Sequence, residues 1–282
     1  TEIREATEKI ARGVGVVGLI NIQYAIADNQ LYVLEANPRA SRTVPYVSKA
    51  TGVQLAKAAA QICVGAKLLE LRERKMVPNS DVGIAHGISV KEAVLPWNRF
   101  RRTDGKGVDS VLGPEMRSTG EVMGIADNFG TAYAKSQIAS FGPLPQRGSV
   151  FLSLSERDKS AALAPATELF RMGFTIYATS GTHSYLAANG VSSTLVRKHS
   201  EPNAGNFVQS AVEIIAAGQV DLVINTPLGR GTRQDGWLIR TAAIQRSLPC
   251  ITTIPGFRAA VAGIQSLRND QLAVRSLQSW LS

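Results

Sequence analysis

Five short apolar runs in the second half of the chain alternate with segments of helical periodicity. The runs are SVFLSL, FTIYA, VSSTLV, DLVIN and CITTI, all between residues 149 and 254. The helical segments between and after them begin near Asp158, Thr182, Asn206, Asp235 and Phe257. Strands that alternate with helices form parallel sheets with helices on both faces. This half is therefore predicted to be an α/β fold with a doubly wound, parallel, five-stranded sheet.

In such sheets, ligands bind outside the carboxyl ends of the strands. The polar residues that follow the predicted strands are Ser153, Ser155, Lys159, Thr179, Ser180, Gly181, Thr182, Arg197, Lys198, Asn225, Thr226, Gly229 and Arg230. The hydroxyl-rich loop TSGTH opens a helix, where free backbone N–H groups favour an anion. The set predicts a phosphate pocket. The alternative is helix capping by Thr179 or Ser180 beside solvated lysines.

The first half contains a predicted hairpin over residues 18–42, because apolar and polar residues alternate on both sides of Asp28-Asn29-Gln30. A three-residue loop at 28–30 would place Gln23 opposite Glu35. A two-residue loop would send these two side chains to opposite faces, since the side-chain period of a strand is two.

With the three-residue loop, Gln23, Glu35 and Asn37 converge on one face of the hairpin. Arg39 and Arg42 follow directly in the sequence. Carboxylate and amide oxygens suit a hard cation such as Mg²⁺, and arginines suit phosphate. The pattern indicates metal-assisted phosphoryl transfer. The alternative is an ordinary solvated hairpin face followed by surface arginines.

The remaining segments predict a helix over 47–68 that stops near Gly65, strands over 87–97 and 118–126, and a helix over 128–139. The Gly- and Pro-rich stretch at 141–148 marks a domain boundary. We therefore expect a first domain over 1–145, α+β with antiparallel sheet, and a second over 146–282.

Composition excludes several classes of function. The net charge is +9, but the basic residues are dispersed and aromatic residues form only 6% of the chain, which disfavours nucleic-acid binding. No apolar run approaches the ~20 residues of a membrane span. The two cysteines, Cys63 and Cys250, are typical of reduced thiols in a cytoplasmic protein.

The string LEANPRASRTVPYVSKATGVQLAKAAAQ resembles the carboxy-terminal ATP-grasp half of the large subunit of carbamoyl-phosphate synthase. SVKEAVLPWNRF and LGPEMRSTGEVMG continue the resemblance in register. Residues from about 149 to 267 resemble that subunit's allosteric domain, which has the methylglyoxal-synthase-like fold. The resemblance implies a carboxy-terminal fragment of this family.

The resemblance implies that Gln23, Glu35 and Asn37 are ligands of Mg²⁺ (or Mn²⁺), and that Arg39 and Arg42 contact phosphate. It further implies ATP-dependent phosphorylation of carbamate to carbamoyl phosphate, for pyrimidine and arginine biosynthesis. The parent enzyme would be oligomeric and partnered by a glutamine amidotransferase small subunit. The family's adenine pocket and phosphate-covering loop lie upstream of residue 1, so we expect the fragment alone to be inactive.

In the second domain, the resemblance implies a site for a nucleoside monophosphate effector, UMP or IMP, formed by Lys159, Thr179, Thr182, Lys198, Asn225 and Arg230. Asn206 stands where stand-alone methylglyoxal synthases carry a catalytic aspartate, which disfavours lyase activity. Glu92 matches an ornithine-contacting glutamate, but Cys250 replaces a tyrosine of that site. A purely nucleotide-sensing module is the competing interpretation of the whole chain.

Overall fold

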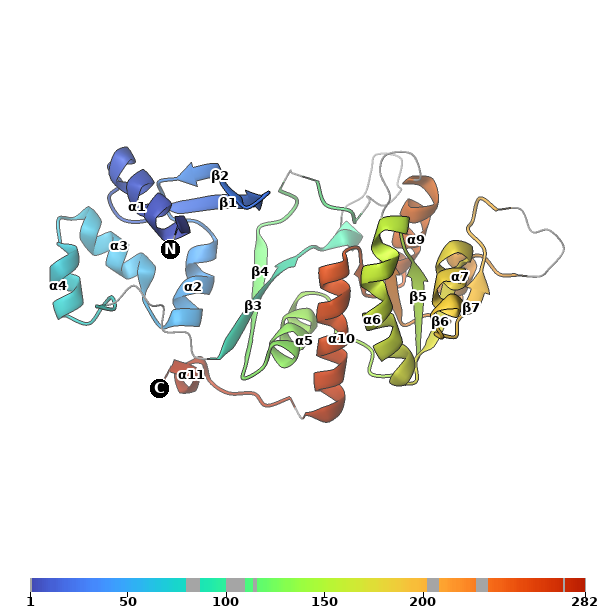
Figure 1. Cartoon of the computed structure of the whole chain (residues 1–282). Coiled ribbons are helices and arrows are strands. Elements are labelled where there is room, and N and C mark those ends of the chain that lie inside the picture. Colours follow the sequence, from blue (N-terminus) through green and yellow to red (C-terminus); the bar gives the residue numbers. More distant parts are fainter. Residues whose placement is uncertain are drawn as a thin grey trace. The chain divides into compact units, whose positions relative to one another are not determined.

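The computed structural model describes residues 2–79, 87–99, 110–113, 116–201, 208–226, 233–270 and 272–281. The chain forms two compact units, one of residues 1–87 with 274–282 and one of residues 88–273 (Figure 1). The boundary predicted between residues 145 and 146 falls inside the second unit, and it stays a prediction. None of the helices in the described ranges combines the length and apolar character that crossing a membrane requires.

The first unit surrounds one hairpin with short helices. Its elements are α1 (Glu2–Val14), β1 (Asn21–Ala27), β2 (Gln30–Asn37), α2 (Thr43–Thr51), α3 (Leu55–Cys63), α4 (Leu68–Glu73) and α11 (Leu277–Leu281). The Thr7 and Tyr24 hydroxyls, 2.7 Å apart, join α1 to the hairpin. Among its described apolar side chains only Ala58, Leu71 and Trp280 are buried, so this unit has a small core.

The hairpin loop differs from the prediction. Ala27 pairs with Gln30, so the loop has two residues, Asp28 and Asn29, and both have the positive φ that a type I′ turn requires. The register then shifts between Gln23 and Tyr24.

Gln23 pairs with Glu35 whereas Tyr24 pairs with Val33, which leaves Leu34 as the extra residue of a β-bulge. The predicted three-residue loop was therefore wrong. The predicted pairing of Gln23 with Glu35 is confirmed, because the bulge in β2 supplies the odd residue that the loop lacks.

The helix predicted over 47–68 is broken. α2 ends at Thr51 because Gly52 adopts a left-handed φ of 75°, and α3 begins only at Leu55. α3 ends at Cys63, two residues before Gly65, as the predicted stop implied. The periodicity was correct within each helix, but it did not show the turn at Gly52.

The second unit contains the predicted parallel sheet. Its strands are β5 (Ser149–Ser153), β6 (Thr175–Thr179), β7 (Thr194–Val196), β8 (Leu222–Asn225) and β9 (Cys250–Ile251), in the order β7-β6-β5-β8-β9. All four neighbouring pairs are parallel. The helices between and after them are α6 (Lys159–Arg171), α7 (Ser180–Ala188), α8 (Ala211–Ala216), α9 (Arg233–Gln245) and α10 (Ile254–Asn269). The predicted fold class is confirmed.

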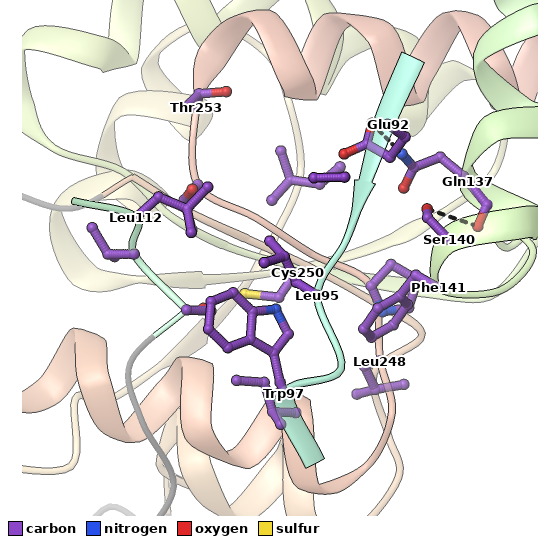
Figure 2. Close-up of a pocket in the computed structure, with 17 residues that line it drawn as sticks. Glu92, Leu95, Trp97, Leu112, Gln137, Ser140, Phe141, Leu248, Cys250 and Thr253 are labelled. Carbon is purple, nitrogen blue, oxygen red and sulfur yellow. Dashed lines mark hydrogen bonds between the residues drawn. The ribbon is translucent and has the colours of Figure 1, made fainter. Parts of the chain in front are cut away.

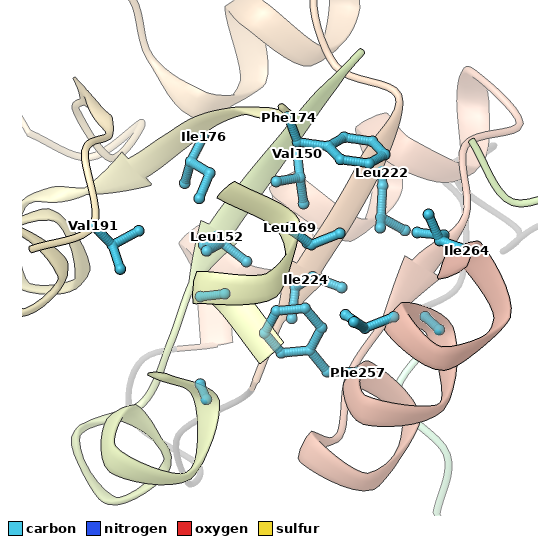
Figure 3. Close-up of a cluster of buried hydrophobic side chains, with 14 of the residues drawn as sticks. Val150, Leu152, Leu169, Phe174, Ile176, Val191, Leu222, Ile224, Phe257 and Ile264 are labelled. Carbon is cyan, nitrogen blue, oxygen red and sulfur yellow. The ribbon is translucent and has the colours of Figure 1, made fainter. Parts of the chain in front are cut away.

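The two faces of this sheet bury alternate residues of the same strands. Val150 and Leu152 of β5 join a cluster with Leu169 of α6 and Phe257 of α10 (Figure 3). Phe151, between them, joins the opposite cluster with residues of α8 and α9. Helices therefore cover both faces, and the near-continuous apolar runs of the strands follow from burial on both sides.

A smaller antiparallel pair, β3 (Ile88–Val94) and β4 (Gly120–Ala126), packs against α5 (Phe129–Ser140) in the same unit. α5 also packs against α10. Two glycines permit these close approaches. A Cβ at Gly124 would lie 2.7 Å from the Ser136 nitrogen, and one at Gly130 would lie 2.9 Å from the Ala262 carbonyl carbon. α5 thus rests directly on the backbones of β4 and α10.

Candidate functional site

The hairpin face brings the three predicted metal ligands together. Gln23 Nε2 and Asn37 Nδ2 donate to the same oxygen, Glu35 Oε1, over 2.8 Å and 2.9 Å. Gln23 lies opposite Glu35 on the neighbouring strand, Asn37 lies two residues further along β2, and Glu35 is exposed. A single carboxylate oxygen is therefore the centre of the cluster, and ligands can approach it.

The cluster fits a hard divalent cation. A carboxylate and two amides provide oxygen donors without sulfur or imidazole, which is the donor set that Mg²⁺ takes. Each amide can rotate so that its oxygen replaces its nitrogen beside the carboxylate, because the two ends of an amide have nearly the same shape. Among the described residues no group of three or more His, Cys, Asp or Glu side chains gathers. This hairpin site depends instead on amides and one carboxylate.

The two predicted phosphate-binding arginines follow β2 within the same unit. Arg42 immediately precedes α2 and occupies its N-cap position. Arg39 is exposed, and its Nη1 donates to the Ala40 carbonyl over 3.1 Å. Both arginines thus lie between β2 and α2, and guanidinium groups suit an anionic ligand such as phosphate.

A second cluster lies at the carboxyl ends of β5, β6 and β8. The chain leaves β5 toward β6 and returns to β8 on its other side, which makes the β5–β8 crevice the switch point where ligands bind. There Ser155 N–H donates to Thr226 Oγ1 over 2.9 Å, and Thr226 N–H donates to the Ser153 carbonyl over 3.1 Å. These bonds hold the two loops in fixed positions.

The predicted hydroxyl loop belongs to the same cluster. Thr182 Oγ1 accepts from Leu154 N–H over 3.0 Å, and Thr179 Oγ1 lies 3.4 Å from Ser153 Oγ. Thr179 is the N-cap of α7, but its side chain makes no capping hydrogen bond within the part of the chain that the structure describes. The capping alternative for Thr179 therefore fails, and its hydroxyl faces the other strand ends instead.

Lys159 brings a positive charge close to this loop. Its Nζ would lie 3.3 Å from a Cβ placed on Gly181, so the absence of a side chain there makes room for the ammonium group. The Lys159 side chain is only 11% exposed and pairs with Glu156 over 2.5 Å, whereas Glu156 is 83% exposed. The ammonium is therefore held at the N-terminus of α7 by a carboxylate that an incoming anion can displace.

The remaining predicted residues are distributed differently. Asn225 ends β8 and is buried. Lys198 is half-buried, and its backbone N–H donates to Glu201 Oε2 over 2.9 Å. Arg197 is occupied by its own loop, because its guanidinium donates to the carbonyl oxygens of Val208 and Glu201 and to Glu213. Asn206, Gly229 and Arg230 lie outside the described residues.

Arg240 is a residue of this cluster that sequence reasoning missed. It belongs to α9, is 2% exposed, and its Nη1 donates to Asn225 Oδ1 over 2.6 Å. The one signal in the sequence is an arginine within the mainly apolar segment WLIRTAAI, where a charged residue is compatible with burial beside a polar partner.

A pocket of about 360 Å³ opens elsewhere in the second unit, between the end of β3, the end of α5 and β9 (Figure 2). Trp97, Phe141 and Leu248 contribute apolar walls, and Cys250 lies among them. Glu92 supplies a carboxylate, to which Gln137 Nε2 donates over 3.0 Å. Burial raises the pKa of Glu92, although the hydrogen bonds from Ala93 N–H and Gln137 partly oppose the shift.

Two family models match the two ends of this architecture. One, described as carbamoyl-phosphate synthase L chain, ATP binding domain, matches residues 1–71. The other, described as MGS-like domain, matches residues 161–252. The hairpin face therefore lies within the first match, and Thr179, Thr182, Asn225 and Arg240 of the strand-end cluster lie within the second.

Curated relatives cover both parts at once. The carbamoyl phosphate synthase large chain of Streptomyces avermitilis is 57% identical over 280 residues, and that of Mycobacterium tuberculosis is 54% identical over 284 residues. Each alignment covers 98% of this chain and 25% of the relative. This chain belongs to the family of carbamoyl phosphate synthase large chains, and it spans about a quarter of the length of the relatives it matches. The resemblance inferred from the sequence blocks is confirmed.

Proposed function

We propose that this chain supplies part of the site at which a carbamoyl phosphate synthase large chain phosphorylates carbamate with ATP. The observation that carries the proposal is the meeting of Gln23, Glu35 and Asn37 at one carboxylate oxygen. In the proposed reaction, a carbamate oxygen attacks the γ-phosphorus, the bond to the bridging oxygen breaks, and ADP leaves with the electron pair. The products are carbamoyl phosphate and ADP.

The residues of the hairpin have separate tasks in this step. A Mg²⁺ or Mn²⁺ ion at the cluster would neutralise the β- and γ-phosphate oxygens of ATP. Glu35 would hold the metal ion through its carboxylate, and the amides of Gln23 and Asn37 orient that carboxylate. Arg39 and Arg42 hold an oxyanion beside the N-terminus of α2. The contribution of the chain is therefore positioning and charge stabilisation.

The test is Glu35→Gln in the full-length enzyme, because Glu35 is the single carboxylate of the trio. We expect ATP-dependent carbamoyl phosphate synthesis to be lost, and Mg²⁺ to bind more weakly. The matched control is Glu8→Gln on α1, where the carboxylate makes an exposed pair with Arg12 at 3.7 Å. Near-normal synthesis in Glu35→Gln would overturn the assignment.

The wider enzyme follows from the same proposal. We expect a glutamine-hydrolysing small subunit to supply ammonia, and an oligomeric parent enzyme that serves pyrimidine and arginine biosynthesis. The hairpin itself supports the view that more chain packs here, since Ile26 and Leu34 are 66% and 64% exposed. Apolar strand residues this exposed are typical of a surface that another segment covers.

We further propose that the MGS-like domain binds a nucleoside monophosphate, UMP or IMP, as an allosteric effector. The supporting observation is the strand-end cluster. Thr179 and Thr182 contact Ser153 and Leu154 at the end of β5, Lys159 Nζ lies close to Gly181 in the first turn of α7, and Asn225 ends β8. Hydroxyls, the backbone N–H groups of a helix N-terminus and an ammonium together suit a phosphate monoester.

Titration calorimetry of the chain with UMP and with IMP tests the effector site, with Lys198→Ala as the variant. We expect saturable heat for at least one nucleotide and weaker binding in Lys198→Ala, because one cation near the phosphate is removed. If neither nucleotide produced heat or a thermal shift, this proposal would be contradicted. It would leave the carbamate site, tested separately by Glu35→Gln, unaffected.

A further inference from the structure

We propose that Arg240 is a positioning residue that fixes the side-chain amide of Asn225 so that the strand-end site presents N–H donors. The inference rests on the proposed effector function of that site. It adds a residue from α9, outside the strand-end loops, and it defines which chemical groups the site accepts.

The contact is buried and closely fitted. Arg240 is 2% exposed, Asn225 is 4% exposed, and Arg240 Nη1 donates to Asn225 Oδ1 over 2.6 Å. Gly236 lies one turn earlier on α9. A Cβ at Gly236 would lie 2.8 Å from Arg240 Nη1 and 3.4 Å from Asn225 Oδ1. The glycine therefore leaves the space through which the guanidinium reaches the amide.

The chemistry of the pair determines the orientation of the amide. A guanidinium only donates hydrogen bonds, so the oxygen of Asn225 must face Arg240. The NH₂ group then faces the carboxyl edge of the sheet, where Nδ2 donates to the Ser153 carbonyl over 3.4 Å. This bond is long, and an amide nitrogen carries two hydrogens. Asn225 thus offers a donor to the same edge at which Lys159 and Thr179 lie.

A site ordered in this way takes a ligand through acceptor atoms, such as the oxygens of a phosphate ester. If the amide were free to turn, its oxygen could face the ligand and repel those atoms. Arg240 thus acts on the ligand through Asn225.

The experiment is titration calorimetry of the chain with UMP, IMP and inorganic phosphate as probes. We expect Arg240→Met to weaken binding about tenfold or more, as the loss of one oriented hydrogen bond to an anion does. Arg240→Lys should retain part of the affinity, because an ammonium also donates to Oδ1. Asn225→Asp should keep the fold through an ion pair with Arg240 and still lose binding, because it replaces donors by a carboxylate.

Gly236→Ala provides a second route that does not remove a buried charge. Alanine favours the helix, so α9 should remain folded. Its Cβ displaces the guanidinium, and we expect weaker nucleotide binding in a chain that still folds, as a cooperative melting transition would show. Unchanged affinity in both Gly236→Ala and Arg240→Met would refute the inference.

A double-mutant cycle separates positioning from a merely structural role. If Arg240 acts through Asn225, Arg240→Met has no further effect on affinity once Asn225 is alanine. If the two losses simply add, Arg240 does not act through Asn225 and the inference fails. If the unmodified chain binds none of the three probes, the effector proposal itself fails, which is a distinct outcome.

Discussion

Replacing Gly124 by alanine should destabilise the second unit strongly. The added Cβ would lie 2.7 Å from the Ser136 nitrogen and closer still to the Ala132 carbonyl oxygen. An ordinary non-bonded contact is about 3.5 Å, so α5 must withdraw by about 0.8 Å at Ser136 and by more at Ala132. Both obstacles are helix backbone, which cannot turn aside as a side chain does.

The magnitude follows from what the withdrawal breaks. A gap of that width removes about a quarter to a half of each van der Waals contact along the α5–β4 interface, where Ala132, Tyr133 and Ser136 are buried. Overpacking typically costs about 1–3 kcal/mol, and a rigid obstacle favours the upper end. We therefore expect a loss of about 3 kcal/mol, or a fall in melting temperature of about 6–12 °C.

Thermal and urea unfolding of the chain, followed by circular dichroism, measures the effect. Gly13→Ala on α1 is the matched control, because nothing lies within 4 Å of its added Cβ, and it should stabilise its helix slightly. The transition that Gly124→Ala lowers should be the one that Gly13→Ala leaves unchanged, since the two sites lie in different units. A loss below about 1 kcal/mol for Gly124→Ala would refute this reasoning about packing.

Two further predictions concern the second unit. Burial raises the pKa of Glu92 above its ordinary value of 4.5, so the folded state holds this proton more tightly than the unfolded state does. Stability therefore falls as the pH rises through the folded pKa, and Glu92→Gln should melt higher than the unmodified chain near neutral pH, with the difference vanishing below pH 4.5. If Glu92→Gln raised the melting temperature equally near neutral pH and below pH 4.5, the raised pKa of Glu92 would be contradicted. We also expect no turnover of dihydroxyacetone phosphate, since Asn206 cannot act as a carboxylate base; measurable methylglyoxal formation would reverse that view.

The strands and helices of the second unit could be predicted because each depends on residues close together in the chain. Burial on both faces makes β5 and β8 continuously apolar, and this pattern is visible without the fold. The strand-end residues Thr179 and Asn225 followed from the same pattern, since parallel strands all end at one edge.

The hairpin shows a prediction that was right for the wrong reason. The polar face required Gln23 opposite Glu35, which needs one extra residue between them. Alternation could not show whether that residue lay in the loop or in a strand. Either position gives the same pairing, and the structure places the extra residue in β2, at Leu34. Gly52 was missed in the same way, because a helical period continues across a single left-handed residue.

The sequence by itself determined the fold class, the alternation of strands and helices along the second unit, and the residue types at each strand end. Only the tertiary structure decided that Arg240 meets Asn225, that α5 packs directly on Gly124, and that Glu92 is half-buried beside Gln137. The physical reason is the range of the interactions. Periodicity and capping depend on neighbours within a few residues, whereas packing and buried hydrogen bonds join residues that only the completed fold brings into contact.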